Sequence, residues 1–265
     1  MASTLTGLTQ PRSTRAYLQL IVYKARAELR AQVSQSFMGV LWWIVEPLLF
    51  LGAFSIVFTQ IIDRGDEDFV PFLLTGLVPW KWFASSLSSG CNSIASNGGL
   101  MRLVYLPKHI YPAVSVVNAT IKFGFVFCLL LVAVLGFGKP ITAAWALLPV
   151  IIGLQFVLQL GVAMLAASLI PFARDLRLLV DNLLLLLMFL SGVFYPISTF
   201  DAEYGWLFLM NPVADLLSCY RAVLLDGTAP NLLAMAVIAA YAVFFCTVGH
   251  LTLKRFDRVY PKIVA

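Results

Sequence analysis

The residues that could do chemistry in this sequence are few, and the first is a carboxylate inside an apolar stretch. Residues 34–60 read SQSFMGVLWWIVEPLLFLGAFSIVFTQ, with Glu46 beside Pro47. A run of about 20 apolar residues can cross a bilayer as a helix, and a carboxylate there usually faces protein or water rather than lipid. Pro47 removes one backbone hydrogen bond and loosens the helix nearby. Glu46 therefore lies near a substrate path or makes a buried structural hydrogen bond, and we favour the second interpretation.

Other polar groups in the apolar segments are its possible partners. Hydrogen bonds to Glu46 could come from Lys81, Lys122 or Asn118. Asp181 is likewise interpreted as a buried structural group. Charge within the apolar segments is then limited to two carboxylates and two lysines, which is too sparse for the carboxylate relay of a typical proton-coupled carrier.

Motifs that would make the chain an enzyme are absent from the sequence. It contains no GxxxxGK[ST] phosphate loop, no HExxH and no GxSxG, and its two histidines are far apart in sequence. Its four cysteines are scattered, without metal-ligand spacing, and are interpreted as small apolar fillers. We therefore expect no catalytic residue, metal or cofactor in this chain, and no ATP hydrolysis by the chain itself. These features favour a passive conduit that another protein drives.

Composition places the chain in a membrane. Of its 265 residues, 61% are hydrophobic and 12% are charged, whereas about a quarter are charged in soluble domains. The net charge of +5 would suggest nucleic acid in a soluble chain, but here the positions of Lys and Arg matter more, and no nucleic-acid partner is expected. Residues 1–17 have no apolar core, so we expect no cleavable secretion signal. The sequence predicts an all-α integral membrane protein with a single domain, residues 1–265.

Apolar runs divide that domain into six predicted transmembrane helices. They cover residues 38–62, 69–89, 111–137, 143–170, 178–197 and 232–253. Residues 206–225 could be a seventh span, but they carry Asp215 and Arg221 and are broken by Asn211-Pro212. Pieces that short cannot cross a bilayer. We predict re-entrant half-helices between the fifth and sixth spans, with an amphipathic surface hairpin as the alternative.

Charge sets the predicted orientation. Basic residues concentrate on the side of both termini, at Arg12, Arg15, Lys24, Arg26, Arg30, Arg102, Lys108, Arg174, Arg177, Lys254, Arg255, Arg258 and Lys262. The opposite side has three basic residues and collects most of the acidic ones. Because cytoplasmic loops carry an excess of Lys and Arg, both termini are predicted to be cytoplasmic, with residues 254–265 as a cytoplasmic tail.

Before the first span, residues 13–35 predict an amphipathic helix. Leu18, Ile21, Val22, Ala25, Leu29 and Val33 form one apolar stripe, and basic residues flank it. This pattern is typical of a helix that lies in the cytoplasmic interface of the membrane. Leu20 and Tyr23 fall outside the stripe and could touch a partner protein, while a generic basic anchor remains the alternative.

Several segments in order resemble one known family. They are SFMGVLWWIVEPLL, LLTGLVPWKWF (73–83), GLMRLVYLPKHIYPAVSV (99–116), GVFYPIS (192–198) and NPVADLLSCYRAVLLDG (211–227), after the basic amphipathic helix. Together they resemble the membrane subunit of bacterial polysaccharide ABC exporters, the Wzm-type permeases for O-antigen, teichoic acid and capsule chains. The resemblance implies a homodimer of six-span subunits in the inner membrane, with the channel at the dimer interface. It also implies two copies of a separate cytoplasmic ATPase, which binds the ATP and Mg.

Under that resemblance, three groups of residues become candidate sites. Aromatic rings could stack on the CH faces of a sugar chain, at Trp42, Trp43, Trp80, Trp82, Phe83, Phe194, Tyr195, Phe200, Tyr204 and Trp206. The alternative is a membrane-interface belt, in which Trp and Tyr gather whatever the substrate. Basic residues of the first helix could hold the phosphate of a lipid-linked glycan at Lys24, Arg26 and Arg30. Residues 100–106 could form a short helix that contacts the ATPase through Met101, Arg102, Leu103, Val104 and Tyr105, because an exposed apolar patch usually marks a contact.

Rival functions remain open at this stage. The substrate could be an O-antigen-like chain, to which the KHIYP segment points, or a capsule or teichoic acid chain. A small-molecule efflux permease is a further alternative, although such proteins normally lack the WWxxEP entry with a basic interfacial helix. A sugar-chain acyltransferase would need a catalytic His, Asp or Glu group at the membrane edge, and none is apparent.

Overall fold

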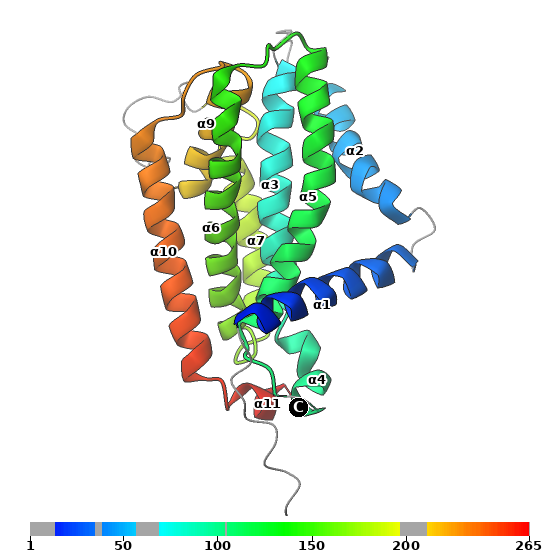
Figure 1. Ribbon diagram of the computed structural model, residues 1–265, viewed down its shortest axis with the longest axis vertical. Coiled ribbons are helices and arrows are strands. Elements are labelled where there is room, and N and C mark those ends of the chain that lie inside the picture. Colours follow the sequence, from blue (N-terminus) through cyan, green and yellow to red (C-terminus); the bar gives the residue numbers. More distant parts are fainter. Residues whose placement is uncertain (1–13, 35–38, 57–68, 104, 197–210, 265) are drawn as a thin grey trace, which may run out of the picture.

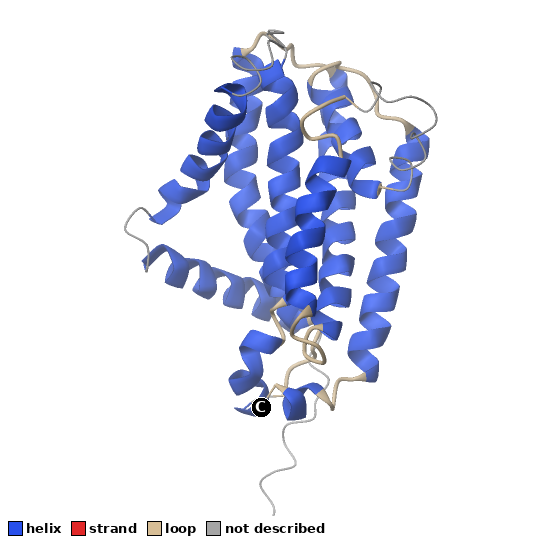
Figure 2. Cartoon of the chain, turned by 180° about the vertical axis from the view of Figure 1, so that it is seen from behind, coloured by secondary structure: helices blue, strands red, loops and turns tan. Residues whose placement is uncertain are grey.

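The computed structural model of the protein describes residues 14–34, 39–56, 69–103, 105–196 and 211–264 (Figure 1). Within these ranges the chain forms helices and no β-strand (Figure 2), which confirms the all-α fold class. The main helices are α1 (Thr14–Ser34), α2 (Trp42–Ile56), α3 (Phe69–Cys91), α4 (Gly98–Leu103), α5 (Ile110–Gly136), α6 (Leu148–Leu169), α7 (Leu176–Leu190), α9 (Pro212–Leu224), α10 (Leu232–Arg255) and α11 (Tyr260–Ile263). Short 3₁₀ turns precede α2, α4 and α6.

The long helices α3, α5, α6 and α10 run side by side along the long axis of the molecule (Figure 1). Among the described residues, three stretches are long and apolar enough to cross a membrane, namely Ile110–Gly136, Ala143–Leu169 and Leu232–Arg255. A helix of 27 residues is about 40 Å long, more than the hydrocarbon thickness of about 30 Å. Their bounds match the third, fourth and sixth predicted spans closely. The count of six remains a prediction, in part because residues 57–62 of the first span lie outside the described residues.

The first predicted span is described only as far as residue 56, and the fifth is shorter than predicted. Helix α2 has 15 residues, and α7 also has 15 residues, ending at Leu190 where we expected the span to continue to residue 197. The chain turns just after α7, and Gly192 there adopts a φ of 67°. Side chains disfavour that left-handed conformation, which glycine adopts readily. The turn directs the chain back toward the bundle interior, where Val193 and Phe194 are buried.

Most of the buried residues form one core that joins α3, α5, α6, α9 and α10. Within it, α6 and α10 approach through small residues. A Cβ atom added to Gly161 would lie 2.5 Å from the backbone nitrogen of Cys246, and one added to Gly249 would lie 2.9 Å from that of Leu165. Small residues let helix backbones touch in this way. The backbones of α6 and α10 are therefore in direct contact.

Both ends of the described chain lie at the same end of the molecule (Figures 1 and 2). Helix α1 crosses α5 there, and α4 and α11 lie below it in Figure 1. A second, smaller core holds this end together, with Ala25, Ile94, Met101, Tyr111 and Tyr260 among its buried members. Helix α9 lies toward the opposite end (Figure 1).

Helix α9 covers the part of the predicted segment 206–225 that follows Asn211-Pro212, and its re-entrant arrangement stays a prediction. It begins where Asn211 Oδ1 accepts hydrogen bonds from the backbone N–H groups of Val213, at 3.0 Å, and Ala214, at 3.4 Å. Pro212 occupies the first turn, where its missing N–H costs nothing. The part of this segment before the break, residues 206–210, lies outside the described residues.

Candidate functional site

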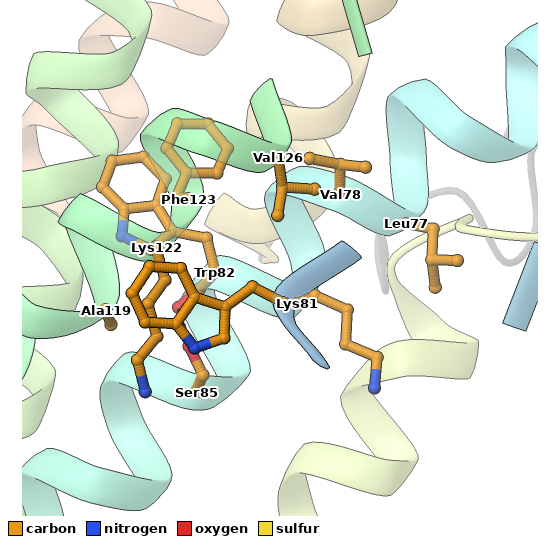
Figure 3. A pocket seen from close by; sticks show the side chains of 10 residues that line it. Leu77, Val78, Lys81, Trp82, Ser85, Ala119, Lys122, Phe123 and Val126 are labelled. Atoms are coloured by element: carbon orange, nitrogen blue, oxygen red, sulfur yellow. Dashed lines mark hydrogen bonds between the residues drawn. The ribbon is translucent and has the colours of Figure 1, made fainter. Parts of the chain in front are cut away.

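A pocket opens between α2, α3 and α5, and it combines aromatic rings with two lysines (Figure 3). Its volume is about 180 Å³. It is lined by Trp43, Leu77, Val78, Lys81, Trp82, Ser85, Ala119, Lys122, Phe123 and Val126. None of these ten residues is a carboxylate, a histidine or a cysteine. The pocket therefore offers a ligand packing surface and positive charge.

One wall of the pocket is a rigid aromatic stack. The rings of Trp82 and Phe123 lie 4.0 Å apart between centroids, with an angle of 11° between their planes, and Figure 3 shows the two rings facing each other. The indole Nε1 of Trp82 donates a hydrogen bond of 3.3 Å to the Thr120 hydroxyl. The stack fixes α3 against α5 and presents ring surface to the pocket.

Two ammonium groups stand at the other edge of the pocket. Lys122 Nζ lies 5.7 Å from the ring centroid of Trp43 and donates a hydrogen bond of 2.8 Å to Gln32 Oε1 of α1. Lys81 of α3 is half-buried, and Figure 3 shows the ammonium groups of Lys122 and Lys81 on the left and right of the lower half of the view. Aromatic faces beside cations can hold a group that has both a CH surface and an anionic centre.

Helix α1 is attached to α5 by polar contacts that the sequence did not indicate. Asn118 Nδ2 donates a hydrogen bond of 2.8 Å to Glu28 Oε2. Lys24 lies 3.7 Å from the same carboxylate, donates a hydrogen bond of 2.9 Å to Asn97 Oδ1, and sits 4.7 Å from the centroid of the Tyr111 ring. Burial lowers the pKa of Lys24, and the charge of Glu28 partly opposes this shift. Asn118 and Lys122, which we had considered as partners of Glu46, are thus engaged by α1.

The three basic residues predicted to bind a lipid-linked phosphate fall into two groups. Lys24 faces α5 and is engaged there by Glu28 and Asn97. Arg26 and Arg30 are exposed on α1. Their assignment as phosphate ligands stays a prediction, and in this arrangement the exposed pair alone is open to a ligand.

The aromatic residues predicted for one path occupy three kinds of position. Trp80, Trp82, Phe83 and Phe194 are buried in the core, and of these only Trp82 lines the pocket. Trp43 is half-buried at the pocket and Trp42 is 47% exposed. Tyr195 donates its hydroxyl hydrogen to the backbone oxygen of Phe189. Phe200, Tyr204 and Trp206 lie outside the described residues. The described aromatic residues therefore do not form a single surface within one chain.

Asp181 requires a correction. We expected a buried structural carboxylate, but its side chain is 45% exposed in the single chain. It lies 4.0 Å from Arg177 Nε and accepts a hydrogen bond of 3.4 Å from the Ser88 hydroxyl. The sequence placed it in an apolar segment, but α7 buries only Leu184 within the described chain, so most of its side chains face outward. The side chain of Glu46 lies outside the described residues.

The segment predicted to contact an ATPase does form a short helix, α4, which ends at Leu103. Met101 is 5% exposed and packs into the smaller core, whereas Leu103 is 83% and Tyr105 is 71% exposed. The side chains of Arg102 and Val104 lie outside the described residues. The exposed side chains of this segment are therefore those of Leu103 and Tyr105, while Met101 anchors the helix from within, and the contact with an ATPase stays a prediction.

Sequence reasoning missed the buried role of Arg221. Its guanidinium donates hydrogen bonds to three backbone oxygens, those of Gly192 at 2.8 Å, Val193 at 3.1 Å and Phe72 at 3.4 Å. It also lies 3.6 Å from the centroid of the Phe72 ring. Five donors in a planar fork suit such a carbonyl cage. The isolated Arg in an otherwise apolar segment was the available signal, because a buried charge of this kind needs partners.

Known proteins match this chain over most of its length. A family model described as ABC-2 type transporter matches residues 19–225. The O-antigen export system permease protein RfbA of Myxococcus xanthus is 29% identical over 229 residues, which cover 86% of this chain and 88% of that protein. An RfbA protein of Klebsiella pneumoniae is 25% identical over 210 residues, 79% of this chain and 81% of that protein. The polysialic acid transport protein KpsM of Escherichia coli is 23% identical over 238 residues, 84% of this chain and 87% of that protein.

The family match agrees with the architecture described above, in which long apolar helices pack side by side and three of them are able to span a membrane. The matched residues 19–225 include most of α1, the pocket between α2, α3 and α5, and the Arg221 cage. The chain is a multi-pass membrane protein that belongs to the ABC-2 type transporter family.

Proposed function

We propose that this chain is the channel-forming membrane subunit of an ATP-driven exporter that moves a lipid-linked polysaccharide across the bacterial inner membrane. The observation that carries the proposal is the near full-length match to export permeases. Relatives that cover 79–86% of this chain are named for O-antigen export and for polysialic acid transport. These names give O-antigen export for the RfbA proteins and polysialic acid transport for KpsM.

The pocket between α2, α3 and α5 supports a sugar-lipid substrate. Its Trp82–Phe123 wall and Trp43 offer ring faces to sugar CH groups, and Lys81 and Lys122 add positive charge for a phosphate. Lys122 is hydrogen-bonded to α1 through Gln32. A ligand in this pocket would therefore lie next to the helix that carries the exposed Arg26 and Arg30.

Energy for export is assigned to a separate subunit. The sequence contains no phosphate loop, so ATP and Mg bind to a partner ATPase of the ABC class, two copies of which pair with a homodimer of this chain. The proposed contact with the ATPase is made by the exposed side chains of Leu103, at the end of α4, and of Tyr105 just after it. Both termini, with α1, α4 and α11, face the cytoplasm in this arrangement, where basic residues concentrate.

A second candidate substrate is a capsule polysaccharide. The match to the polysialic acid transport protein KpsM covers 84% of this chain and 87% of KpsM. The higher identities are to the O-antigen export proteins, at 29% and 25% against 23%. The order of these identities favours an O-antigen-like polysaccharide as the substrate.

The test is a deletion of the gene followed by analysis of surface glycans. We expect one surface polysaccharide to disappear while its lipid-linked precursor accumulates inside the cell, and complementation with the wild-type chain should restore it. Loss of an O-antigen-like glycan would support the first candidate substrate, whereas loss of a capsule polysaccharide would support the second. Unchanged surface glycans would reject polysaccharide export. Copurification of an ATPase that has a phosphate loop tests the partner assignment independently.

A further inference from the structure

A second pocket lies at the end of the molecule where α5 begins and α10 ends, away from the pocket in Figure 3. Its volume is about 490 Å³. It is lined by Tyr105, Pro107, Lys108, His109, His250, Leu253, Lys254, Arg255, Asp257 and Arg258. The function proposed above uses only Tyr105 among these residues.

The pocket is strongly basic. Four cations and one carboxylate line it, which gives 4 − 1 = +3 before either histidine is counted. The carboxylate of Asp257 is already engaged, because Lys108 Nζ lies 3.9 Å from it and the Tyr105 hydroxyl donates a hydrogen bond of 2.7 Å to it. Burial lowers the pKa of Lys108, an effect partly opposed by Asp257. Lys254, Arg255 and Arg258 are exposed and are the cations available to a ligand.

Two histidine side chains line the same pocket. The rings of His109 and His250 lie 5.8 Å apart between centroids, which joins the start of α5 to the end of α10. Burial, and then the neighbouring His250, lower the pKa of His109, and the charge of Asp257 partly opposes this shift.

The position of the pocket relative to the apolar helices identifies the source of the anion. Both α5 and α10 are candidate membrane spans, so residues just before Ile110 and at Lys254–Arg258 stand at the level of the lipid headgroups. Next to the pocket, α10 presents an exposed apolar strip toward the membrane, with Leu251 at 59%, Phe244 at 57% and Val243 at 65% exposure. A ligand with a phosphate and acyl chains can contact both the basic pocket and the apolar strip of α10, whereas a soluble anion can contact only the basic pocket.

We propose that this pocket binds the phosphate group of an anionic phospholipid, with the headgroup held by Lys254, Arg255 and Arg258 and the acyl chains along the exposed face of α10. Basic pockets between membrane helices on the basic side of a protein are suited to such headgroups. The site would be occupied by bulk membrane lipid, independently of any exported glycan.

The test is native mass spectrometry of the full-length chain, purified from membranes and titrated with phosphatidylglycerol or with phosphatidylcholine. The variant is Lys254→Gln with Arg255→Gln and Arg258→Gln. The matched control is Arg174→Gln with Arg177→Gln and Lys262→Gln, three exposed basic residues at the same end of the molecule. Wild type and control should prefer phosphatidylglycerol. The pocket variant should lose about fivefold in affinity for each charge removed, the factor that corresponds to about 1 kcal/mol per basic residue.

Three outcomes would overturn the proposal. Equal losses in the pocket variant and the control would reduce the effect to general surface attraction. Displacement of phosphatidylglycerol by excess inorganic phosphate, but not by chloride of the same ionic strength, would make the pocket a site for a soluble anion. Unchanged lipid binding in the pocket variant, together with loss of a copurified ATPase, would make it part of a protein interface.

Discussion

Two polar residues buried inside the bundle, Gln155 and Arg221, are hydrogen-bonded to groups of other helices and turns. Gln155 of α6 donates a hydrogen bond of 2.9 Å to the backbone oxygen of Pro79 and accepts one of 2.9 Å from the Tyr220 hydroxyl. Arg221 is held by three backbone oxygens in the same manner. Because buried polar groups are costly when unpaired, these contacts fix α3, α6 and α9 relative to one another.

Gly76 provides the space for the Arg221 cage, and its replacement should destabilise the protein. A Cβ atom at Gly76 would lie 2.5 Å from Arg221 Nη2 and 3.2 Å from the backbone oxygen of Val193. We expect Gly76→Ala to lower the free energy of unfolding by about 1–3 kcal/mol, the usual cost of overpacking. Gly124→Ala is the control, because no atom lies within 4 Å of its added Cβ. Thermal unfolding of the detergent-solubilised protein measures both, and equal midpoints for the two variants would contradict the cage.

Trp43 and Trp80 should respond differently to truncation. Trp43 is half-buried and lines the pocket, so Trp43→Ala should slow glycan export while the protein still inserts and pairs with its ATPase. Trp80 is 3% exposed in the core, and its truncation should cost about 3–5 kcal/mol of stability. Quantitative blots of membrane protein against surface glycan separate the two effects. Loss of Trp43→Ala protein from the membrane would instead favour a structural role.

At the scale of elements, the apolar runs alone were enough to place most helices. Predicted spans 69–89, 111–137 and 232–253 correspond to α3, α5 and α10 within two residues at each end, because helix length and apolarity are local properties. The faces of these helices were not predictable from one sequence. Trp80, Lys81 and Trp82 are neighbours in α3, yet Trp80 is buried away from the pocket that the other two line.

The attachment of α1 also depended on contacts that sequence patterns do not carry. Glu28 and Asn118 are 90 residues apart, as are Gln32 and Lys122. The apolar stripe predicted a helix lying in the membrane interface, and the structure places Ala25 and Leu29 of that stripe in buried positions but leaves Val22 43% exposed. The polar side at Lys24 and Glu28 therefore packs against α5, and the orientation of α1 is set jointly by both kinds of contact.

Arg26 and Arg30 should be sensitive to replacement by lysine if they bind phosphate. Both are exposed on α1 and one helical turn apart, so their guanidinium groups can address one anion. Arg donates two parallel hydrogen bonds to phosphate oxygens, whereas Lys offers only a point charge. Arg26→Lys with Arg30→Lys should assemble with its ATPase but export poorly, with lipid-linked chains accumulating inside. Arg174→Lys with Arg177→Lys is the control, and wild-type export by the α1 variant would remove both residues from the site.

At the scale of the whole molecule, the arrangement of helices agrees with the orientation in the membrane that the charges predict. The start of α1, the end of α10 and α11 lie at one end (Figure 1), together with the basic residues of the second pocket. The turn after α5, with Lys139, lies at the opposite end, as does the segment between α9 and α10 (Figure 1). The charge pattern of the sequence predicts that the first end is cytoplasmic.

Cysteine labelling tests this sidedness directly. The native residues Cys91, Cys128, Cys219 and Cys246 are all free thiols and are first replaced by alanine. Probes at Lys139→Cys and Asp226→Cys should then react with an impermeant reagent in intact cells. Probes at Arg174→Cys and Lys262→Cys should react only after permeabilisation. Labelling of the position 262 probe in intact cells would refute the six-span orientation.

The glycine contacts between α6 and α10 have a mechanical consequence. Helices slide past one another when a layer of flexible side chains between them can change rotamers, but at Gly161 and Gly249 the two backbones touch without such a layer. The pair should therefore move as one stiff lever. Any push that reaches the charged end of α10 would therefore be carried to the opposite end of α6.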